Sequence, residues 1–488
     1  LLAVAMVCAM AIPAFAYDTK EDLDTKHEYD AFQIFKGDVS DDNTKISHVE
    51  WGQNIPHPED FLPKLRADST LSSEFANADS LQKVLDVMKD WKTSDDNSIA
   101  FARFVCNYIY TDANANSTPV KQGGHTGGFE LDEAGYYLIV DTSPFSDGDS
   151  YHAYNSFLLK VNKAHYHVQI TPKVVKPTVE KKVYDNDDGS SWGDNDGWGS
   201  SADHAINEEF QFQLIATLPA SENNGRAYDY YDEYMVTFCD TLSAGITFDR
   251  WDTVVINNGG ADIPIPAENY YSDASNQDLT LSIEDVKTCA PGLNLNNGAT
   301  ITVTYTAHLN EKAYVNTAGG ASNTENKNSV YLIYSNNPRS SAFFDRTPES
   351  AVCVYTYQLN NTKYHDEANS GNELEGAGFK LYSDADCKNE VELYQDGEFY
   401  YPIKNATGKE AVEMKSAANG QFNVKGLDAG TYYLRETKTP DDYNACADKE
   451  IVISATHDVN HVSLSGNLST TIINKKAGGI TLPSTGGI

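Results

Sequence analysis

The sequence is poor in positive charge, in methionine and in cysteine. Its 488 residues carry 36 Lys and Arg against 71 Asp and Glu, a formal net charge of −35. Such a surface repels phosphates, so we expect no nucleic acid among the partners. Only five methionines accompany 30 tyrosines and 19 phenylalanines, a balance that favours strands.

The seven cysteines show no CxxC spacing, which argues against a zinc site. In a secreted chain Cys387 and Cys446, or Cys239 and Cys289, are possible pairs, but spacing does not fix the connectivity. The Asp- and Gly-rich stretch 185–203 lacks carboxylates at the positions of a calcium-binding EF-hand loop, so we interpret it as a flexible loop. We expect neither a metal nor a cofactor.

One uncharged apolar run stands at the start. Residues 1–16, LLAVAMVCAMAIPAFA, end in Ala14-Phe15-Ala16, which is typical of a secretory signal and its cleavage site. The run is too short to span a membrane. We expect the sequence to begin inside this signal and the mature protein to begin near Tyr17.

The length suggests about three domains. Residues 17–172 mix strand-like segments with helical apolar spacing over 80–92 and 98–110, which predicts a helical insertion in a β domain. Residues 173–340 and 341–476 show short strands between turn residues, a pattern typical of β-sandwiches. Residues 477–488 remain as a tail. The expected fold class is mainly β, with tandem sandwich domains.

A lysine-rich connector joins the first two domains. The stretch 168–183, VQITPKVVKPTVEKKV, carries four lysines in an otherwise acidic chain. It can be a plain linker with solvated lysines. Alternatively, one lysine joins another molecule and a second joins the far end of its own domain.

Period-2 alternation separates inward from outward side chains. Val179, Lys181 and Val183 share one strand face, so Lys181 is predicted to point into a core and Lys182 out of it. Asp240 shares a face with Val236 and Phe238 in the same way.

The same pattern recurs near the end of the chain. Tyr432, Leu434 and Glu436 share a face, and a glutamate on an apolar face needs a buried partner.

Three motifs carry a resemblance to a known family. The end of the sequence, Leu482-Pro483-Ser484-Thr485-Gly486, resembles the LPxTG sorting signal of Gram-positive surface proteins. Residues 432–443, YYLRETKTPDDY, resemble the pilin E-box, and with 374–382, LEGAGFKLY, they are similar to Cna B-type domains. Ile170-Thr171-Pro172-Lys173 stands where the family has its pilin motif, with Thr171 and Val174 in place of the motif's Tyr and Asn.

Together the motifs resemble the major (backbone) subunit of a sortase-assembled Gram-positive pilus. The resemblance implies tandem immunoglobulin-like or Cna B-type sandwiches in a secreted, wall-anchored surface fibre that supports adhesion and colonisation. A sortase would cut after Thr485, and Lys173 of the next subunit would take the acyl group. Such head-to-tail linkage does not close and gives a filament.

The implied partners are identical subunits, a pilin-specific sortase, accessory pilins and cell-wall peptidoglycan. The chain would be a sortase substrate and not an enzyme. We expect the apolar segment and basic tail of a sorting signal to lie beyond the present sequence.

The resemblance also implies internal Lys–Asn isopeptide bonds, each formed autocatalytically with a buried acid. In residues 341–476 it assigns Lys363, Glu436 and Asn474. In residues 173–340 Lys181 and Asp240 are joined by Asn336, which ends the strand predicted over 330–335, with Asn337 as the next choice. The first domain has Asp141 where the acid would stand but no clear lysine–asparagine pair, so we expect no bond there.

Two other functions compete. A monomeric wall-anchored adhesin would keep the sorting signal and the E-box but leave Lys173 inert; no D-x-S-x-S motif supports a metal-dependent tip adhesin. A secreted glycan-active enzyme would need a nucleophile or metal constellation, which the sequence does not show.

Overall fold

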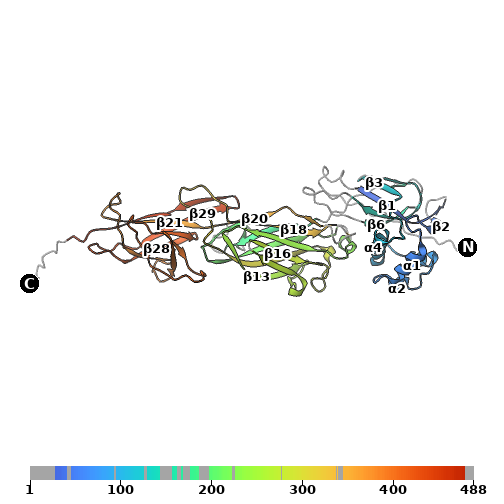
Figure 1. The fold of residues 1–488 in the computed structure, drawn as a ribbon, viewed down its shortest axis with the longest axis horizontal. Coiled ribbons are helices and arrows are strands. Elements are labelled where there is room, and N and C mark those ends of the chain that lie inside the picture. The colour runs from blue at the N-terminus through green and yellow to red at the C-terminus, as the bar shows by residue number, and fades with distance from the viewer. Residues whose placement is uncertain are drawn as a thin grey trace, which may run out of the picture.

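The computed structural model is elongated, with three parts arranged end to end (Figure 1). It describes residues 28–40, 46–92, 95–125, 129–142, 156–161, 166–168, 176–185, 197–221, 226–275, 277–336, 338 and 344–478. None of the helices in these residues is both long and apolar enough to cross a membrane.

The first part is a β-sheet covered by helices. Strand β1 pairs with β2, β3 and β5, and β6 follows β5, while β4 and β7 form a separate pair. The helices lie between β2 and β3 in sequence, and the inner faces of α1, α3 and α4 pack on the apolar face of β1. The elements are β1 (Glu28–Val39), β2 (Ile46–Trp51), α1 (Pro58–Ala67), α2 (Ser72–Phe75), α3 (Leu81–Met88), α4 (Asp96–Thr111), β3 (Lys121–His125), β4 (Phe129–Leu131), β5 (Gly135–Asp141), β6 (Ser156–Val161) and β7 (Tyr166–Val168).

The helical insertion is therefore present, and it is larger than its sequence pattern indicated. The apolar spacing over 80–92 and 98–110 corresponds to α3 and α4. Helices α1 and α2 were not predicted. Proline is tolerated where Pro58 stands, at the start of α1, but Pro63 lies inside the ten-residue helix and weakens the helical signal.

The middle part is a sandwich of two sheets. One has the order β14-β13-β17-β11-β8-β9, and the other β10-β20-β18-β12-β16-β15 with β19 on β18. Strand β11 shows why the sheets pack, since its alternation buries Phe210, Phe212, Leu214 and Ala216 on one face.

The elements of this part are β8 (Thr178–Tyr184), β9 (Trp198–Gly199), β10 (Ser201–Asp203), β11 (Glu209–Leu218), η2 (Ala227–Tyr230), β12 (Val236–Leu242), β13 (Ile246–Asn257), β14 (Ile263–Pro264), η3 (Ala267–Asn269), β15 (Tyr271–Ser275), β16 (Asp278–Ile283), η4 (Leu295–Asn297), β17 (Ala299–Leu309), β18 (Lys327–Ser335), β19 (Phe344–Arg346) and β20 (Ser350–Tyr355).

The third part is a smaller sandwich. Its sheets have the orders β24-β25-β27-β21-β31 and β23-β22-β28-β29-β30, with β26 on β22. The first and last strands, β21 and β31, lie side by side and run parallel. The elements are β21 (Tyr357–His365), β22 (Gly378–Tyr382), β23 (Glu390–Val391), β24 (Leu393–Asp396), β25 (Phe399–Pro402), β26 (Met414–Lys415), β27 (Asn423–Leu427), β28 (Gly430–Lys438), β29 (Lys449–Asp458), β30 (His461–Gly466) and β31 (Ser469–Asn474).

The predicted boundary between residues 340 and 341 is wrong. Strands β19 and β20 pair with β18 and so complete a middle sheet. The third sandwich begins with β21, directly after Thr356. The sequence did not reveal this, because residues 350–365 are two consecutive strands that belong to different sandwiches.

The segment 201–208 joins the middle sandwich to the third one. The backbone N–H of Ile206 donates to Gly426 O at 2.9 Å, and that of His204 to Tyr355 O at 3.0 Å. The Asn207 side chain donates to Pro402 O at 2.7 Å. These buried bonds tie two sandwiches through one short segment.

Candidate functional sites

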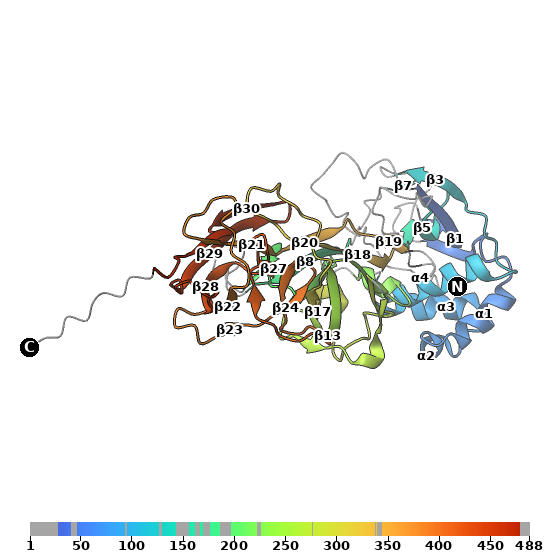
Figure 2. The ribbon, with the colours of Figure 1, turned by 60° about the vertical axis from the view of Figure 1, so that its left-hand side comes forward.

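Among the described residues, two lysines are buried: Lys181 is 2% exposed and Lys363 is 0% exposed. Burying an isolated ammonium in an apolar interior is costly, so each needs either a charged partner or deprotonation. Lys181 lies on β8 in the middle sandwich and Lys363 on β21 in the third. Figure 2 labels β8 in the middle part and β21 in the third part.

The third sandwich brings Lys363 together with an asparagine and a glutamate. Lys363 Nζ donates to Asn474 Oδ1 and lies 3.8 Å from Glu436 Oε1. Asn474 Nδ2 donates to Glu436 Oε1 at 2.7 Å. The side chains of Lys363 and Glu436 are both fully buried. The three residues assigned from the sequence are thus in mutual contact.

The register of β21 against β31 brings Lys363 and Asn474 together. Along the parallel pair, Lys363 lies opposite Ile472 and His365 opposite Asn474, so the asparagine stands two residues beyond the partner of the lysine on the neighbouring strand. Glu436 comes from β28 in the facing sheet, where the alternation that buries Tyr432 and Leu434 turns it inward.

The second oxygen of Glu436 is also held. Its Oε2 accepts the backbone N–H of Cys446 at 2.9 Å and the Thr439 hydroxyl at 3.2 Å. These two bonds leave Oε1 facing the lysine and the asparagine. Burial lowers the pKa of Lys363, and the nearby Glu436 carboxylate opposes that shift. Burial also raises the pKa of the Cys446 thiol to about 11.

The middle sandwich holds a second buried cluster around Lys181. Lys181 Nζ donates to Asp240 Oδ2 at 2.5 Å and to the Tyr305 hydroxyl at 3.1 Å. The Tyr305 hydroxyl in turn donates to Asp240 Oδ2 at 2.7 Å. The aromatic faces of Phe212 and Tyr305 lie 5.1 and 5.3 Å from the lysine nitrogen.

Burial in this cluster favours the neutral forms of its members. Desolvation lowers the pKa of Lys181 to about 8, although Asp240 opposes the shift. Desolvation also raises the pKa of Asp240, against the effect of Lys181. A lysine with a lowered pKa and an acid with a raised one are what amide transfer requires of a nucleophile and a proton donor.

The structure does not bring Asn336 to this cluster. Asp240 lies opposite Val330 on the neighbouring strand, and Asn336 lies six positions further along. At ~3.3 Å per residue that is about 20 Å. The Asn336 side chain is buried without a hydrogen bond to its nitrogen or oxygen, but Lys181 is out of its reach.

The asparagine that meets the cluster is Asn328. It is fully buried on β18, on the same face as Val330, and its Nδ2 donates to the Tyr305 hydroxyl at 2.5 Å. The Lys181 amine and the Asn328 carboxamide therefore contact one and the same oxygen atom. The signal was present in the sequence, because Asn328, Val330, Leu332 and Tyr334 alternate inward. It was missed because the strand was predicted to begin only at Val330.

The other residues predicted from the sequence lie away from these two buried clusters or outside the described residues. Lys173, Leu482, Pro483, Ser484, Thr485 and Gly486 lie outside the described residues. Asp141 is fully buried on β5, and the described residues of the first part include no buried lysine beside it. Cys239, Cys289, Cys387 and Cys446 form no disulfide in the described structure, so neither possible pair is joined.

Elsewhere in the described part of the chain, two clusters have side chains that could hold a metal ion. Asp185, Asp203 and His457 place ligand atoms within 4.8 Å of one another, as do His204, Glu208 and Asp428. The first cluster is tied internally, because Asp203 N donates to Asp185 Oδ2 at 3.0 Å and His457 Nδ1 lies 2.9 Å from Ser201 Oγ. Both clusters lie where the middle and third sandwiches meet.

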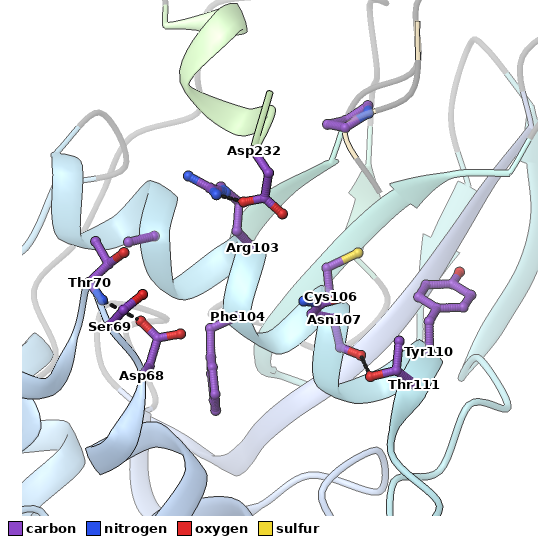
Figure 3. A pocket seen from close by; sticks show the side chains of 12 residues that line it. Asp68, Ser69, Thr70, Arg103, Phe104, Cys106, Asn107, Tyr110, Thr111 and Asp232 are labelled. Atoms are coloured by element: carbon purple, nitrogen blue, oxygen red, sulfur yellow. Dashed lines mark hydrogen bonds and ion pairs between the residues drawn. The ribbon is translucent and has the colours of Figure 1, made fainter. Parts of the chain in front are cut away.

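A cavity of about 270 Å³ lies between the first part and the middle sandwich. Figure 3 shows Arg103 of α4 pointing toward Asp232 of the middle sandwich, with which it forms an ion pair. Asp68 and Ser69 form one wall, while Asn107 lies further along α4. The cavity lies at a polar contact between the first part and the middle sandwich, and the residues that line it include no catalytic constellation.

Comparisons with known proteins bear on the whole chain. The SpaA prealbumin-like fold domain matches residues 360–467. The T6 backbone pilin of serotype M6 Streptococcus pyogenes, a modular three-domain structure, matches with a TM-score of 0.52 and 15% identity, covering 93% of this chain and 98% of that one. This chain has the fold of a backbone pilin.

Other solved pilins are similar at lower TM-scores. The full-length major pilin SpaD of Corynebacterium diphtheriae gives 0.44 at 19% identity, covering 75% of this chain and 84% of that one. A 35 kDa C-terminal fragment of the major pilin GBS80 of Streptococcus agalactiae gives 0.42 at 21%, covering 61% and 99%. The sequence matches none of the curated proteins with which it was compared. The mainly β fold class and, at the level of fold, the resemblance to Gram-positive pilus backbone subunits are confirmed.

Proposed function

We propose that this protein is the structural backbone subunit of a covalently polymerised pilus on a Gram-positive surface, stabilised by two internal Lys–Asn isopeptide bonds. The observation that carries the proposal is the contact of buried Lys363 with both Asn474 and Glu436. A soluble domain has little reason to bury a lysine against a carboxamide and an acid unless the three groups react or specify the fold.

The internal reaction is an amide transfer. The neutral Lys363 amine attacks Cγ of Asn474, a new Cγ–Nζ bond forms, and the Cγ–Nδ2 bond breaks with its electron pair on nitrogen. One proton moves from Nζ to Nδ2, which leaves as ammonia. Glu436 Oε1 lies 2.7 Å from Nδ2 and 3.8 Å from Nζ, so the Glu436 carboxyl group can give a proton to Nδ2 and be reprotonated by the proton that Nζ loses.

In the middle sandwich we propose the bond between Lys181 and Asn328, with Asp240 as the acid. This assignment replaces Asn336, which lies too far along its strand. The support is that Lys181 Nζ and Asn328 Nδ2 both contact the Tyr305 hydroxyl.

Intact mass spectrometry with peptide mapping tests both bonds. Each bond expels one ammonia, so the mature chain is expected ~17 Da lighter per bond. Asn328→Ala should restore one such increment and Asn336→Ala none. The opposite result would return the assignment to Asn336, and a chain of unshifted mass would remove the internal chemistry.

Between subunits we propose that a pilin-specific sortase joins Thr485 of one copy to Lys173 of the next, and that accessory pilins and cell-wall peptidoglycan are further partners of the fibre. The support is the sorting motif at 482–486 and the lysine that precedes the middle sandwich, together with the backbone-pilin fold. The protein would be a substrate of the sortase and would support adhesion and colonisation from the cell surface.

Polymerisation separates this proposal from a monomeric wall-anchored adhesin. Co-expression with a pilin-polymerising sortase should give a ladder of covalent multimers, and Lys173→Ala should abolish it, while the matched change Lys176→Ala should not. A ladder that survives Lys173→Ala would exclude this lysine. The absence of any ladder with an active sortase would favour the monomeric adhesin.

A further inference from the structure

The two buried sites differ in how the acid reaches the asparagine. In the third sandwich Glu436 Oε1 accepts directly from Asn474 Nδ2 at 2.7 Å. In the middle sandwich Asp240 Oδ2 contacts Lys181 Nζ and the Tyr305 hydroxyl, and Asn328 Nδ2 reaches the Tyr305 hydroxyl instead. Aspartate is one methylene shorter than glutamate, and a tyrosine hydroxyl occupies the gap.

We propose that Tyr305 is a catalytic proton relay that completes the short acid of the middle site. This inference rests on the proposed isopeptide function and adds a reacting residue to it. Tyr305 lies on β17 in the same sheet as Lys181, and its hydroxyl touches the nucleophile at 3.1 Å, the acid at 2.7 Å and the carboxamide nitrogen at 2.5 Å.

The relay balances as a one-proton cycle. Protonated Asp240 gives its proton to the Tyr305 oxygen, and Tyr305 gives its own hydroxyl proton to Asn328 Nδ2. Asp240 takes the proton that Lys181 Nζ loses as the Cγ–Nζ bond forms. The Cγ–Nδ2 bond breaks, ammonia leaves, and both the acid and the phenol are regenerated.

The surroundings of Tyr305 hold this hydroxyl in place. The side chain is fully buried, and its ring packs between Phe212 at 5.2 Å and Trp251 at 5.6 Å between centroids. Burial raises the pKa of Tyr305 well above its ordinary value, so the phenol stays protonated and can pass a proton without ionising. A fixed hydroxyl between three reacting groups meets the geometric demand on a proton-transfer group.

The test follows bond formation in the full chain by time. Chains solubilised from inclusion bodies in denaturant are diluted into refolding buffer and quenched at intervals, and each bond is measured by intact mass and peptide mapping. Tyr305→Phe should slow formation of the middle bond by about 100-fold or more, the usual contribution of a general acid or base. The bond of the third sandwich should form at the wild-type rate and serves as an internal control.

Two further variants distinguish chemistry from packing. Tyr228→Phe removes the hydroxyl of another buried tyrosine of the same sandwich, which donates to Pro219 O at 2.9 Å, and should leave the rate unchanged. The double variant Asp240→Glu/Tyr305→Phe supplies the longer acid of the third site and should recover most of the rate. Circular dichroism and intrinsic tryptophan fluorescence of the full chain establish that each variant folds.

The outcomes are separable. A wild-type rate in Tyr305→Phe, or a folded double variant that stays as slow as Tyr305→Phe, would overturn the relay and leave the isopeptide function standing. A wild-type chain that releases no ammonia from either site would overturn the isopeptide function and the relay with it.

Discussion

Replacing Glu436 with glutamine should leave the third sandwich folded but without its cross-link. Glutamine has nearly the same volume and can still accept the backbone N–H of Cys446, which now bonds the carboxylate at 2.9 Å. It cannot carry a proton from the lysine to the departing nitrogen. Intact mass should therefore rise by ~17 Da relative to the cross-linked wild type, beyond the change of side chain, because one ammonia is retained.

The loss of stability can be worked from the size of the closed loop. Lys363 and Asn474 are 111 positions apart. The loop-closure relation used for disulfides gives about 5 kcal/mol for a loop of this size. For a domain of roughly 120 residues each kcal/mol shifts the melting temperature by about 4 °C. We therefore expect the third sandwich to melt about 20 °C lower in the variant.

Differential scanning calorimetry of the full chain measures this shift as a displaced transition. Glu450→Gln is the matched control, because Glu450 is exposed on the neighbouring strand β29 and opposite Tyr433. This control should change the free energy of unfolding by no more than ~0.5 kcal/mol, so its melting transition should stay close to that of the wild type.

A double-mutant cycle removes the contribution of lost contacts. Lys363→Met abolishes the bond by itself, so Glu436→Gln added to it reports only the local effect of the amide. If Glu436→Gln keeps the bond, Glu436 is not the acid. If it loses the bond and the transition moves by only a few degrees, the entropic account of the cross-link is wrong.

Three other outcomes are expected. Burial lowers the pKa of Lys181 to about 8, so the neutral fraction of its amine decreases as the pH falls below 8. Formation of the Lys181–Asn328 bond during refolding should therefore be about 50-fold slower at pH 6 than at pH 8. A rate that does not change between these pH values would contradict an amine nucleophile with this pKa. Under force, Lys363→Met should release roughly 380 Å more chain than the cross-linked wild type, as measured by single-molecule extension, and equal lengths would mean that no bond spans the loop. Gly426→Ala should destabilise the junction between the middle and third sandwiches by about 1–3 kcal/mol, because the added Cβ would lie 2.5 Å from Ile206 Cδ1 at a φ of +83°. Limited proteolysis and calorimetry measure this loss. Gly371→Ala is the control, because Gly371 also has a positive φ but open space around it.

Alternation along strands was the part of the sequence that predicted the sites best. Lys181 and Glu436 were placed inward because each shares a face with two apolar residues, and both side chains are buried. The pattern works because a strand side chain has only two directions to point, and one of them is the core. It requires no knowledge of which strands are neighbours.

The pairing of strands could not be read in the same way. Asn336 was chosen for its position at the end of a predicted strand, whereas the choice between it and Asn328 depends on the register of β18 against β12. Register is set by contacts between segments about 90 residues apart, and a shift of a few positions moves a side chain by ~10–20 Å. The boundary error near residue 340 has the same cause, because the partners of β20 are distant in sequence.

The two cross-links would carry tension differently. In the third sandwich the chain enters on β21 and leaves from β31, and these strands are parallel neighbours. Tension along the chain would shear them past each other, and a bond between Lys363 and Asn474 carries that load across the strand pair, so everything between the two residues is unloaded. In the middle sandwich a bond between Lys181 and Asn328 still leaves β18, β19 and β20 between the bond and the third sandwich.

The strands between Asn328 and the third sandwich, β18 to β20, are held in the middle sandwich by non-covalent contacts such as hydrogen bonds, and these contacts would have to resist tension on that segment. Strand β20 lies between β18 and the short strand β10, and the Ser350 hydroxyl accepts the backbone N–H of Lys181 itself at 2.9 Å. The segment 201–208 then continues from β10 into the third sandwich through Ile206 and Gly426. If the two proposed bonds form, the junction between the two sandwiches is the place where non-covalent packing would have to resist the tension that covalent bonds carry elsewhere, and its buried hydrogen bonds suit it to that load.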